Sequence, residues 1–178
     1  MSKSISIPNI FIKKDLDNNN VIVTCLSFSK QIRNKINEIA KTITKLDLSC
    51  CKINGTNLIE LVEILKNCKV LESLKLNLNS INIDEAIDIV TVITNCSNLK
   101  ELDLSNNNII LDKNSDKTIV QSPSETLESS LKLTVLINKL KDCTSLINLN
   151  LSCNSIIKEN IMEFEKNLPD CTICWTYY

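Results

Sequence analysis

Histidine is absent from this 178-residue chain, and arginine occurs once, at Arg33. Without histidine the chain lacks the commonest acid–base side chain and the commonest metal ligand, and a serine nucleophile would have no imidazole base. A single arginine leaves almost no side chain for bidentate phosphate binding. We therefore expect no catalytic residues, no metal, no cofactor and no enzymatic activity.

Glycine also occurs only once, at Gly55, which excludes a glycine-rich loop for nucleotide phosphates. No apolar run approaches the length of a membrane-spanning helix, so we expect no contact with a membrane. The N-terminal stretch lacks the apolar segment of a secretory signal, which favours a cytoplasmic protein. The net charge of -1 gives no basic field that would attract nucleic acid.

A repeated apolar pattern dominates what is present. The clearest copy, Leu99 to Ile109, reads L-x-x-L-x-L-x-x-N-x-I, and related copies begin at Ile43, Leu71 and Leu146. The copies are 28, 28 and 47 residues apart. The alternating leucines predict a short strand with one buried face, and the asparagine is suited to satisfy backbone groups in the turn that follows.

Segments with helical spacing of apolar residues separate these strands. We predict helices over 29–42, 57–67, 84–95, 123–141 and 158–168. Ser29 is a candidate N-cap of the first helix, and Ser122-Pro-Ser-Glu125 predicts the start of the long fourth one. Stacked strand–helix units of this kind form one continuous core.

Residues 43–171 resemble leucine-rich repeats of the ribonuclease-inhibitor type, and the recurring cysteines also resemble those of NOD-like receptors and F-box leucine-rich proteins. The resemblance implies an α/β fold, a leucine-rich repeat solenoid shaped as a short right-handed horseshoe. Its parallel sheet would be concave and its helices convex. It also implies binding to a protein partner.

We divide the chain into three parts. Residues 1–42 form an N-terminal cap, with a hairpin or two short strands, and a degenerate first repeat. Residues 43–171 form four repeats with an insertion at about 110–130, and 172–178 form a C-terminal capping strand. Asp15, Asp17 and Asn19 match the first calcium ligands of an EF-hand, but Leu26 stands where a bidentate glutamate is required. We interpret 13–20 as a polar turn.

Nine cysteines in a cytoplasmic protein are expected to be free thiols. Cys68, Cys96, Cys143 and Cys171 each follow a predicted helix, which indicates a buried structural role. With a 28-residue period, Cys174 would also take a core position. We therefore prefer buried thiols to a zinc or redox site at Cys171-x-x-Cys174.

Alternation along the strands predicts which side chains occupy the concave face. They are Lys45, Asp47, Ser49, Ser73, Lys75, Asn77, Glu101, Asp103, Ser105, Asn148, Asn150 and Ser152. The central column, Asp47, Lys75, Asp103 and Asn150, would pair opposite charges on neighbouring strands. The 110–121 loop adds Thr118, Ile119 and Val120. The alternatives are a solvated face and a tolerated insertion.

We predict a protein–protein interaction module that binds through the concave face and the 110–121 loop. One alternative is a regulatory or cytoskeletal cap resembling the tropomodulin repeats, or an adaptor. Another is a GTPase-activating protein, which would need a positioned arginine, although Arg33 falls on a predicted helix. We expect a monomer, with association through Trp175 and Tyr177 at the last strand as an alternative.

Overall fold

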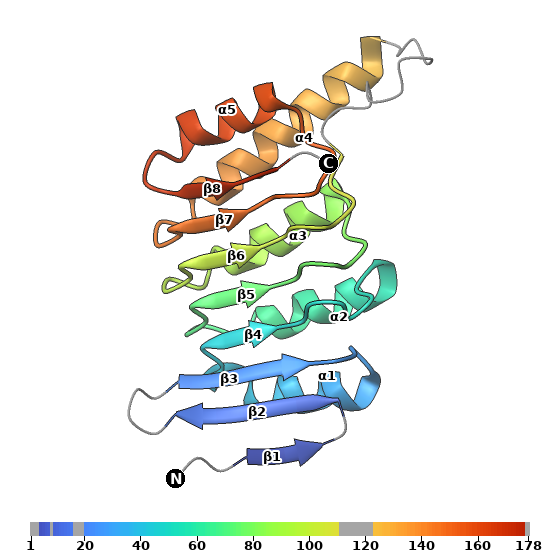
Figure 1. Cartoon of the computed structure of the whole chain (residues 1–178), viewed down its shortest axis with the longest axis vertical. Coiled ribbons are helices and arrows are strands. Elements are labelled where there is room, and N and C mark those ends of the chain that lie inside the picture. The colour runs from blue at the N-terminus through green and yellow to red at the C-terminus, as the bar shows by residue number, and fades with distance from the viewer. Residues whose placement is uncertain (1–3, 8, 16–19, 111–122, 177–178) are drawn as a thin grey trace.

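The computed structural model describes residues 4–7, 9–15, 20–110 and 123–176. Eight strands form one sheet in sequence order, with helices packed along it (Figure 1). The strands are β1 (Ser4–Ile7), β2 (Ile10–Asp15), β3 (Asn20–Cys25), β4 (Lys45–Asp47), β5 (Ser73–Lys75), β6 (Glu101–Asp103), β7 (Asn148–Asn150) and β8 (Thr172–Cys174). The helices are α1 (Lys30–Ile39), α2 (Gly55–Leu65), α3 (Ile83–Ile93), α4 (Pro123–Lys141) and α5 (Lys158–Asn167), with a 3-10 turn, η1, at Ala40–Thr42.

The first three strands are antiparallel, and the remaining pairings are parallel. The N-terminal segment therefore forms more sheet than the two strands expected from sequence. Strand β3 pairs in parallel with β4 and leads into α1, so it supplies the strand of the degenerate first repeat. Ser29 caps α1 as predicted, because its side chain accepts from the backbone N–H of Ile32.

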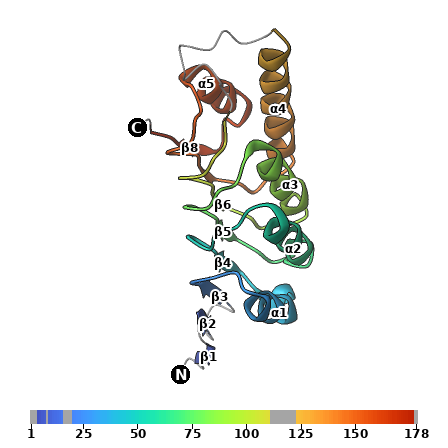
Figure 2. The same cartoon turned by 90° about the vertical axis from the view of Figure 1, so that its right-hand side faces the viewer.

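The repeat leucines align across the sheet. Leu46, Leu74, Leu102 and Leu149 are paired in register, and all four are buried. Figure 2 shows α1 to α4 on one side of the sheet. We call the other side the open face; it is the predicted concave face. The predicted helices are confirmed within a few residues of their observed ends.

Helix α4 has 19 residues and is longer than its neighbours, as predicted. It slants away from the other helices in Figure 1 and runs almost vertically in Figure 2, so its N-terminal end projects beyond the helix stack. Ser122 of the predicted capping sequence lies outside the described residues, as do Asp17, Asn19, Thr118, Ile119 and Val120.

The last repeat is shorter than the sequence period predicted. Leu149 is paired with Ile173, only 24 residues later. Leu168, rather than Cys171, is the buried residue that ends α5. The shorter repeat leaves Cys171 half-buried and places Cys174 opposite Asn150 on the open face, where Cys174 is exposed. The predicted core position of Cys174 was therefore wrong, whereas Cys171 packs against the core but is only partly buried.

Candidate protein-interaction surface

The open face carries the predicted polar side chains in two aligned columns. One contains Lys45, Ser73, Glu101 and Asn148, and the other contains Asp47, Lys75, Asp103 and Asn150. Because the register is uniform, side chains from different repeats lie directly beside one another. The strands thus bring together residues that are up to 103 positions apart in the sequence.

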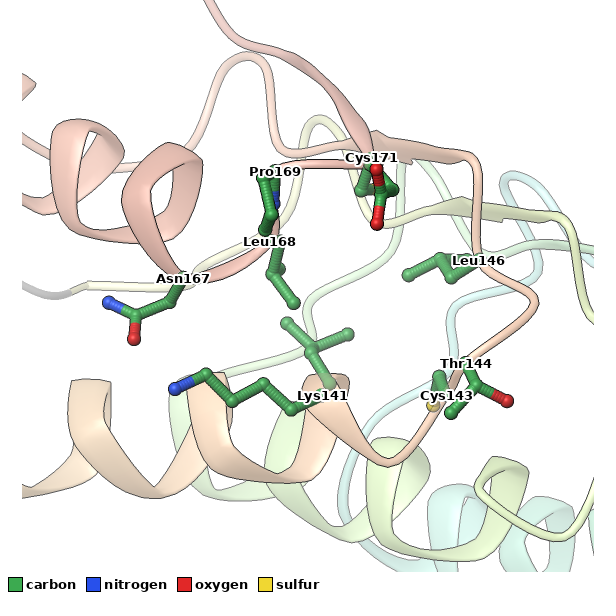
Figure 3. Close-up of a pocket in the computed structure, with 10 residues that line it drawn as sticks. Lys141, Cys143, Thr144, Leu146, Asn167, Leu168, Pro169 and Cys171 are labelled. Atoms are coloured by element: carbon green, nitrogen blue, oxygen red, sulfur yellow. The ribbon is translucent and has the colours of Figure 1, made fainter.

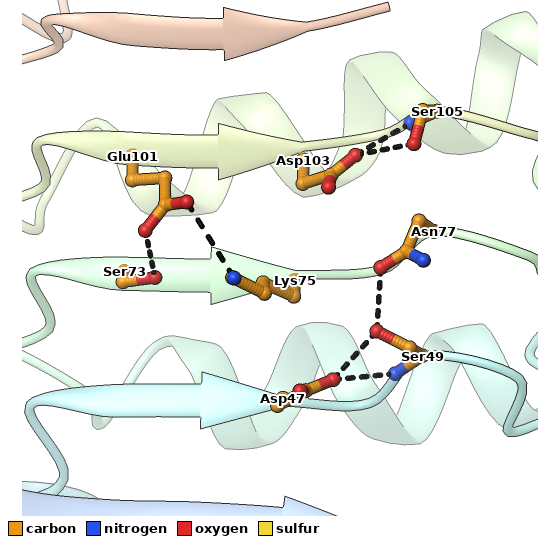
Figure 4. Close-up of polar contacts among 8 residues, drawn as sticks. All are labelled: Asp47, Ser49, Ser73, Lys75, Asn77, Glu101, Asp103 and Ser105. Carbon is orange, nitrogen blue, oxygen red and sulfur yellow. Dashed lines mark hydrogen bonds and ion pairs between the residues drawn. The ribbon is translucent and has the colours of Figure 1, made fainter. Parts of the chain in front are cut away.

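Asp47 is held by the residue that follows its strand. Its Oδ1 accepts from the backbone N–H of Ser49 at 3.0 Å and lies 2.6 Å from the Ser49 hydroxyl. The same hydroxyl lies 2.5 Å from Oδ1 of Asn77 in the next repeat (Figure 4). Because a hydroxyl has one proton, it donates to one of these oxygens at a time. This cluster orients three side chains on the open face.

Asp103 repeats this arrangement. Its Oδ1 accepts from the backbone N–H and the hydroxyl of Ser105, at 2.9 and 2.7 Å. Asn150 likewise accepts from the backbone N–H of Ser152, at 3.1 Å. Ser105 is buried, so less of it faces solvent than the alternation predicted. The short polar side chains are fixed by the backbone that follows them, and they are therefore preorganised.

Lys75 pairs with a different carboxylate from the one predicted. Its Nζ lies 3.7 Å from Glu101 Oε1, and the other Glu101 oxygen accepts from the buried Ser73 hydroxyl at 2.7 Å (Figure 4). The predicted register is confirmed, since Lys75 lies between Asp47 and Asp103 in its column, but its ion pair is with Glu101 and not with either aspartate. Each aspartate is turned toward the serine of its own repeat, while the longer glutamate reaches across from the neighbouring column.

The sequence prediction missed the N-terminal part of the open face. Phe11 is paired with Thr24, which is paired with Asp47; Lys13 is paired with Ile22, which is paired with Lys45. Directly opposite residues share a face of the sheet, so these side chains extend the two columns. Alternation in 10–15 and 20–25 was visible, but the antiparallel pairing that places them on the open face has no repeat motif.

Arg33 lies between α1 and α2 rather than on the open face. It forms an ion pair with Glu60 and donates from Nη1 to the Phe28 carbonyl at 2.8 Å. Its guanidinium also lies 5.7 Å from the Phe28 ring centroid. These contacts give Arg33 a structural role in joining the first two helices.

All nine cysteines are free, and five are buried: Cys25, Cys51, Cys68, Cys96 and Cys143. Burial raises the pKa of Cys68 and Cys143 to about 12 and that of Cys96 to about 11. Nucleophilic attack and metal binding require the thiolate. These three thiols are therefore inert at neutral pH, which agrees with a structural role.

A cavity of about 250 Å³ lies where the short last repeat turns from α5 into β8. Leu146 and Leu168 point into the space between α4 and β8, and Lys141 and Asn167 lie at one end of it (Figure 3). Trp175 is half-buried and packs against the core beyond β8, while Tyr177 lies outside the described residues.

The described ranges contain neither a candidate metal site nor a candidate membrane span. No cluster of three or more histidine, cysteine, aspartate or glutamate side chains is placed there to hold a metal ion. No helix in those ranges is long and apolar enough to cross a membrane.

No protein-family model and no curated protein matches the sequence. The fold is similar to that of a solved structure described as leiomodin-1 actin-binding site 2, with a TM-score of 0.60 and 14% identity over 83% of this chain and 78% of that one. An internalin from Listeria monocytogenes gives a TM-score of 0.35 at 17% identity over 79% of this chain. A leucine-rich repeat protein from Leptospira interrogans gives a TM-score of 0.39 at 17% identity over 78% of this chain.

The chain spans less than half of those two bacterial proteins, 46% and 38% of their lengths. Its fold is established by its own geometry, in which strand and helix alternate along a parallel sheet with leucines in register, and by the similarity to the leiomodin-1 structure. The chain has the leucine-rich repeat fold.

Proposed function

We propose that this chain is a non-enzymatic interaction module that binds a protein partner through its open face. The observation that carries the proposal is the preorganised polar surface of β4 to β7. Asp47, Asp103 and Asn150 each accept from the backbone N–H two residues later. A partner that binds such a surface loses little entropy in ordering these side chains.

The position of this surface also supports the proposal. Helices α1 to α4 lie on the opposite side of the sheet (Figure 2), so they leave the open face accessible. The predicted columns lack the aromatic and arginine side chains that dominate tight interfaces, and Phe11 adds an aromatic side chain only at their N-terminal extension. We therefore expect binding of moderate affinity that weakens as the salt concentration rises.

Affinity capture with charge-reversed variants tests this function. The intact chain should retain a partner that the Asp47→Lys, Asp103→Lys double variant loses by at least tenfold, because two carboxylates at the centre of the face become cations. The matched control is Asp88→Lys with Asp142→Lys, two exposed aspartates outside the sheet. Equal capture by both double variants, with folding confirmed by circular dichroism, would reject the open face as the binding surface.

A second candidate function is binding to actin. It is favoured by one observation, the fold similarity to the structure described as an actin-binding site of leiomodin-1. Co-sedimentation with filamentous actin tests it directly. Saturable pelleting of the intact chain would support actin binding, and a chain that stays in the supernatant across a range of actin concentrations would reject it.

A further inference from the structure

A patch of apolar and basic side chains occupies the N-terminal end of the open face. It consists of Phe11, Lys13, Ile22, Thr24 and Lys45, and we call it the N-terminal patch. Phe11 is 57% exposed although it lies within a strand that is paired on both sides. A large exposed apolar side chain beside other apolar surface is typical of a binding site.

The two lysines flank the apolar part of the patch. Ile22 is half-buried and is paired with Lys13 on one side and Lys45 on the other. Neighbouring strands lie about 4.8 Å apart, so the two lysine backbones are about 10 Å apart across Ile22. Both lysines are exposed, and neither forms an ion pair with a carboxylate whose side chain the structure describes, a set that leaves out Asp15 and Asp17.

Asp47 and Glu101 are nearby carboxylates with described side chains, and neither forms an ion pair with Lys13 or Lys45. Asp47 is hydrogen-bonded to Ser49, and Glu101 contacts Ser73 and Lys75. The open face is therefore divided by charge. The described side chains at its N-terminal end are apolar and basic, its centre carries carboxylates, and β7 presents the neutral Asn148 and Asn150.

We propose that the N-terminal patch binds a protein segment in which an apolar side chain is flanked by carboxylates. This inference rests on the proposed function and names the partner chemistry for one end of the same face. The apolar side chain would pack on Phe11 and Ile22, and the carboxylates would pair with Lys13 and Lys45. Repulsion by Asp47, Asp103 and Glu101 would keep the acidic segment at this end of the face.

Matched peptides test the proposal by fluorescence anisotropy. Three labelled peptides of about twelve residues would share a central pair of leucines, flanked by glutamate, glutamine or lysine. We expect the glutamate peptide to bind at least tenfold more tightly than the glutamine peptide, and the lysine peptide to bind most weakly. Equal affinity for the glutamate and glutamine peptides would overturn the proposal.

Variants locate the binding. The Lys13→Glu, Lys45→Glu double variant should bind the glutamate peptide at least tenfold more weakly. Phe11→Thr, which keeps a strand-forming residue, should bind it at least fivefold more weakly. The matched control is Lys30→Glu, an exposed lysine on the first turn of α1, where a carboxylate suits the helix dipole. Peptide binding that survives the lysine and Phe11 substitutions would exclude the patch.

Two further comparisons separate this proposal from its alternatives. If the patch variants still capture the natural partner while the Asp47→Lys, Asp103→Lys double variant does not, the proposed function stands and the patch is excluded. If none of these variants affects capture, both fail. Binding to phosphatidylserine vesicles that is stronger than binding to the glutamate peptide would show that the patch binds an anionic membrane instead.

Discussion

The side-chain amide of Asn107 donates a hydrogen bond to the backbone carbonyl of Leu76, 3.0 Å away, and so joins two successive repeats. Its Oδ1 accepts from the backbone N–H of Ile81 at 3.1 Å. Asn79 and Asn154 make the equivalent contacts to their preceding repeats. The asparagines therefore form a ladder through the solenoid, and each one satisfies backbone groups that the short strands leave unpaired.

Removal of one rung should destabilise the protein. In Asn107→Ala, the carbonyls of Leu76 and Leu104 and the N–H of Ile81 lose their side-chain partner. Since each unsatisfied buried group costs about 1–3 kcal/mol, we expect the free energy of unfolding to fall by about 3 kcal/mol in urea titrations. Asn108→Ala, at an exposed neighbour, should change it by less than about 0.5 kcal/mol.

Leu78 occupies a position that suits asparagine better than leucine. Its φ is 57°, in the left-handed region, and Asn106 has a φ of 53° at the equivalent position of the next repeat. Leucine there costs about 1–2 kcal/mol, whereas asparagine tolerates this conformation. Leu78→Asn should therefore raise the free energy of unfolding by about 1 kcal/mol.

The reciprocal variant is the control for this strain. Asn106→Leu should lower the free energy of unfolding by a similar amount, while Leu78→Ala should gain nothing because alanine keeps the unfavourable φ. Calorimetry of the three proteins checks the order. A stabilised Leu78→Ala protein would show that the exposed leucine side chain, rather than its backbone conformation, carries the cost.

The contacts of Arg33 predict a role in stability. Arg33→Met keeps an apolar stem of similar length but removes the hydrogen bond to the Phe28 carbonyl and the ion pair with Glu60. We expect the free energy of unfolding, measured in urea titrations, to fall by about 1–2 kcal/mol. Lys35→Met breaks only the exposed pair with Glu38 and should cost less than about 1 kcal/mol.

The buried thiols predict a loss of stability at alkaline pH. Burial raises the pKa of Cys68 to about 12 from 9.0, so the unfolded state loses this proton first as the pH rises. The stabilisation is complete below pH 9 and is lost between pH 9 and 12, by up to about 1.4 kcal/mol per pH unit for each thiol. Urea titrations from pH 8 to 10 should show the decline, and Cys68→Ala should make it shallower. An identical slope in the variant would contradict the assignment.

The repeat motif was sufficient to predict the strands, the helices and the asparagine turns, because a local pattern determines each of them. It did not predict how Phe11 and Lys13 extend the open face, since their antiparallel pairing depends on contacts that no motif marks. The exposure of Cys174 was missed because the last repeat is four residues shorter than the period. The partner of Lys75 was missed because aspartate and glutamate differ in reach, which alternation does not distinguish.

Site-specific photo-crosslinking tests the central claim most directly. A photoreactive phenylalanine analogue would replace Asn148 on the open face or, in the control, Met162, an exposed residue of α5. Each variant would be irradiated together with the partner that affinity capture retains. We predict that position 148 forms a covalent adduct with this partner and that position 162 does not. An adduct at position 162 with none at 148 would show that the partner binds at α5, and would contradict the open face as the interaction surface.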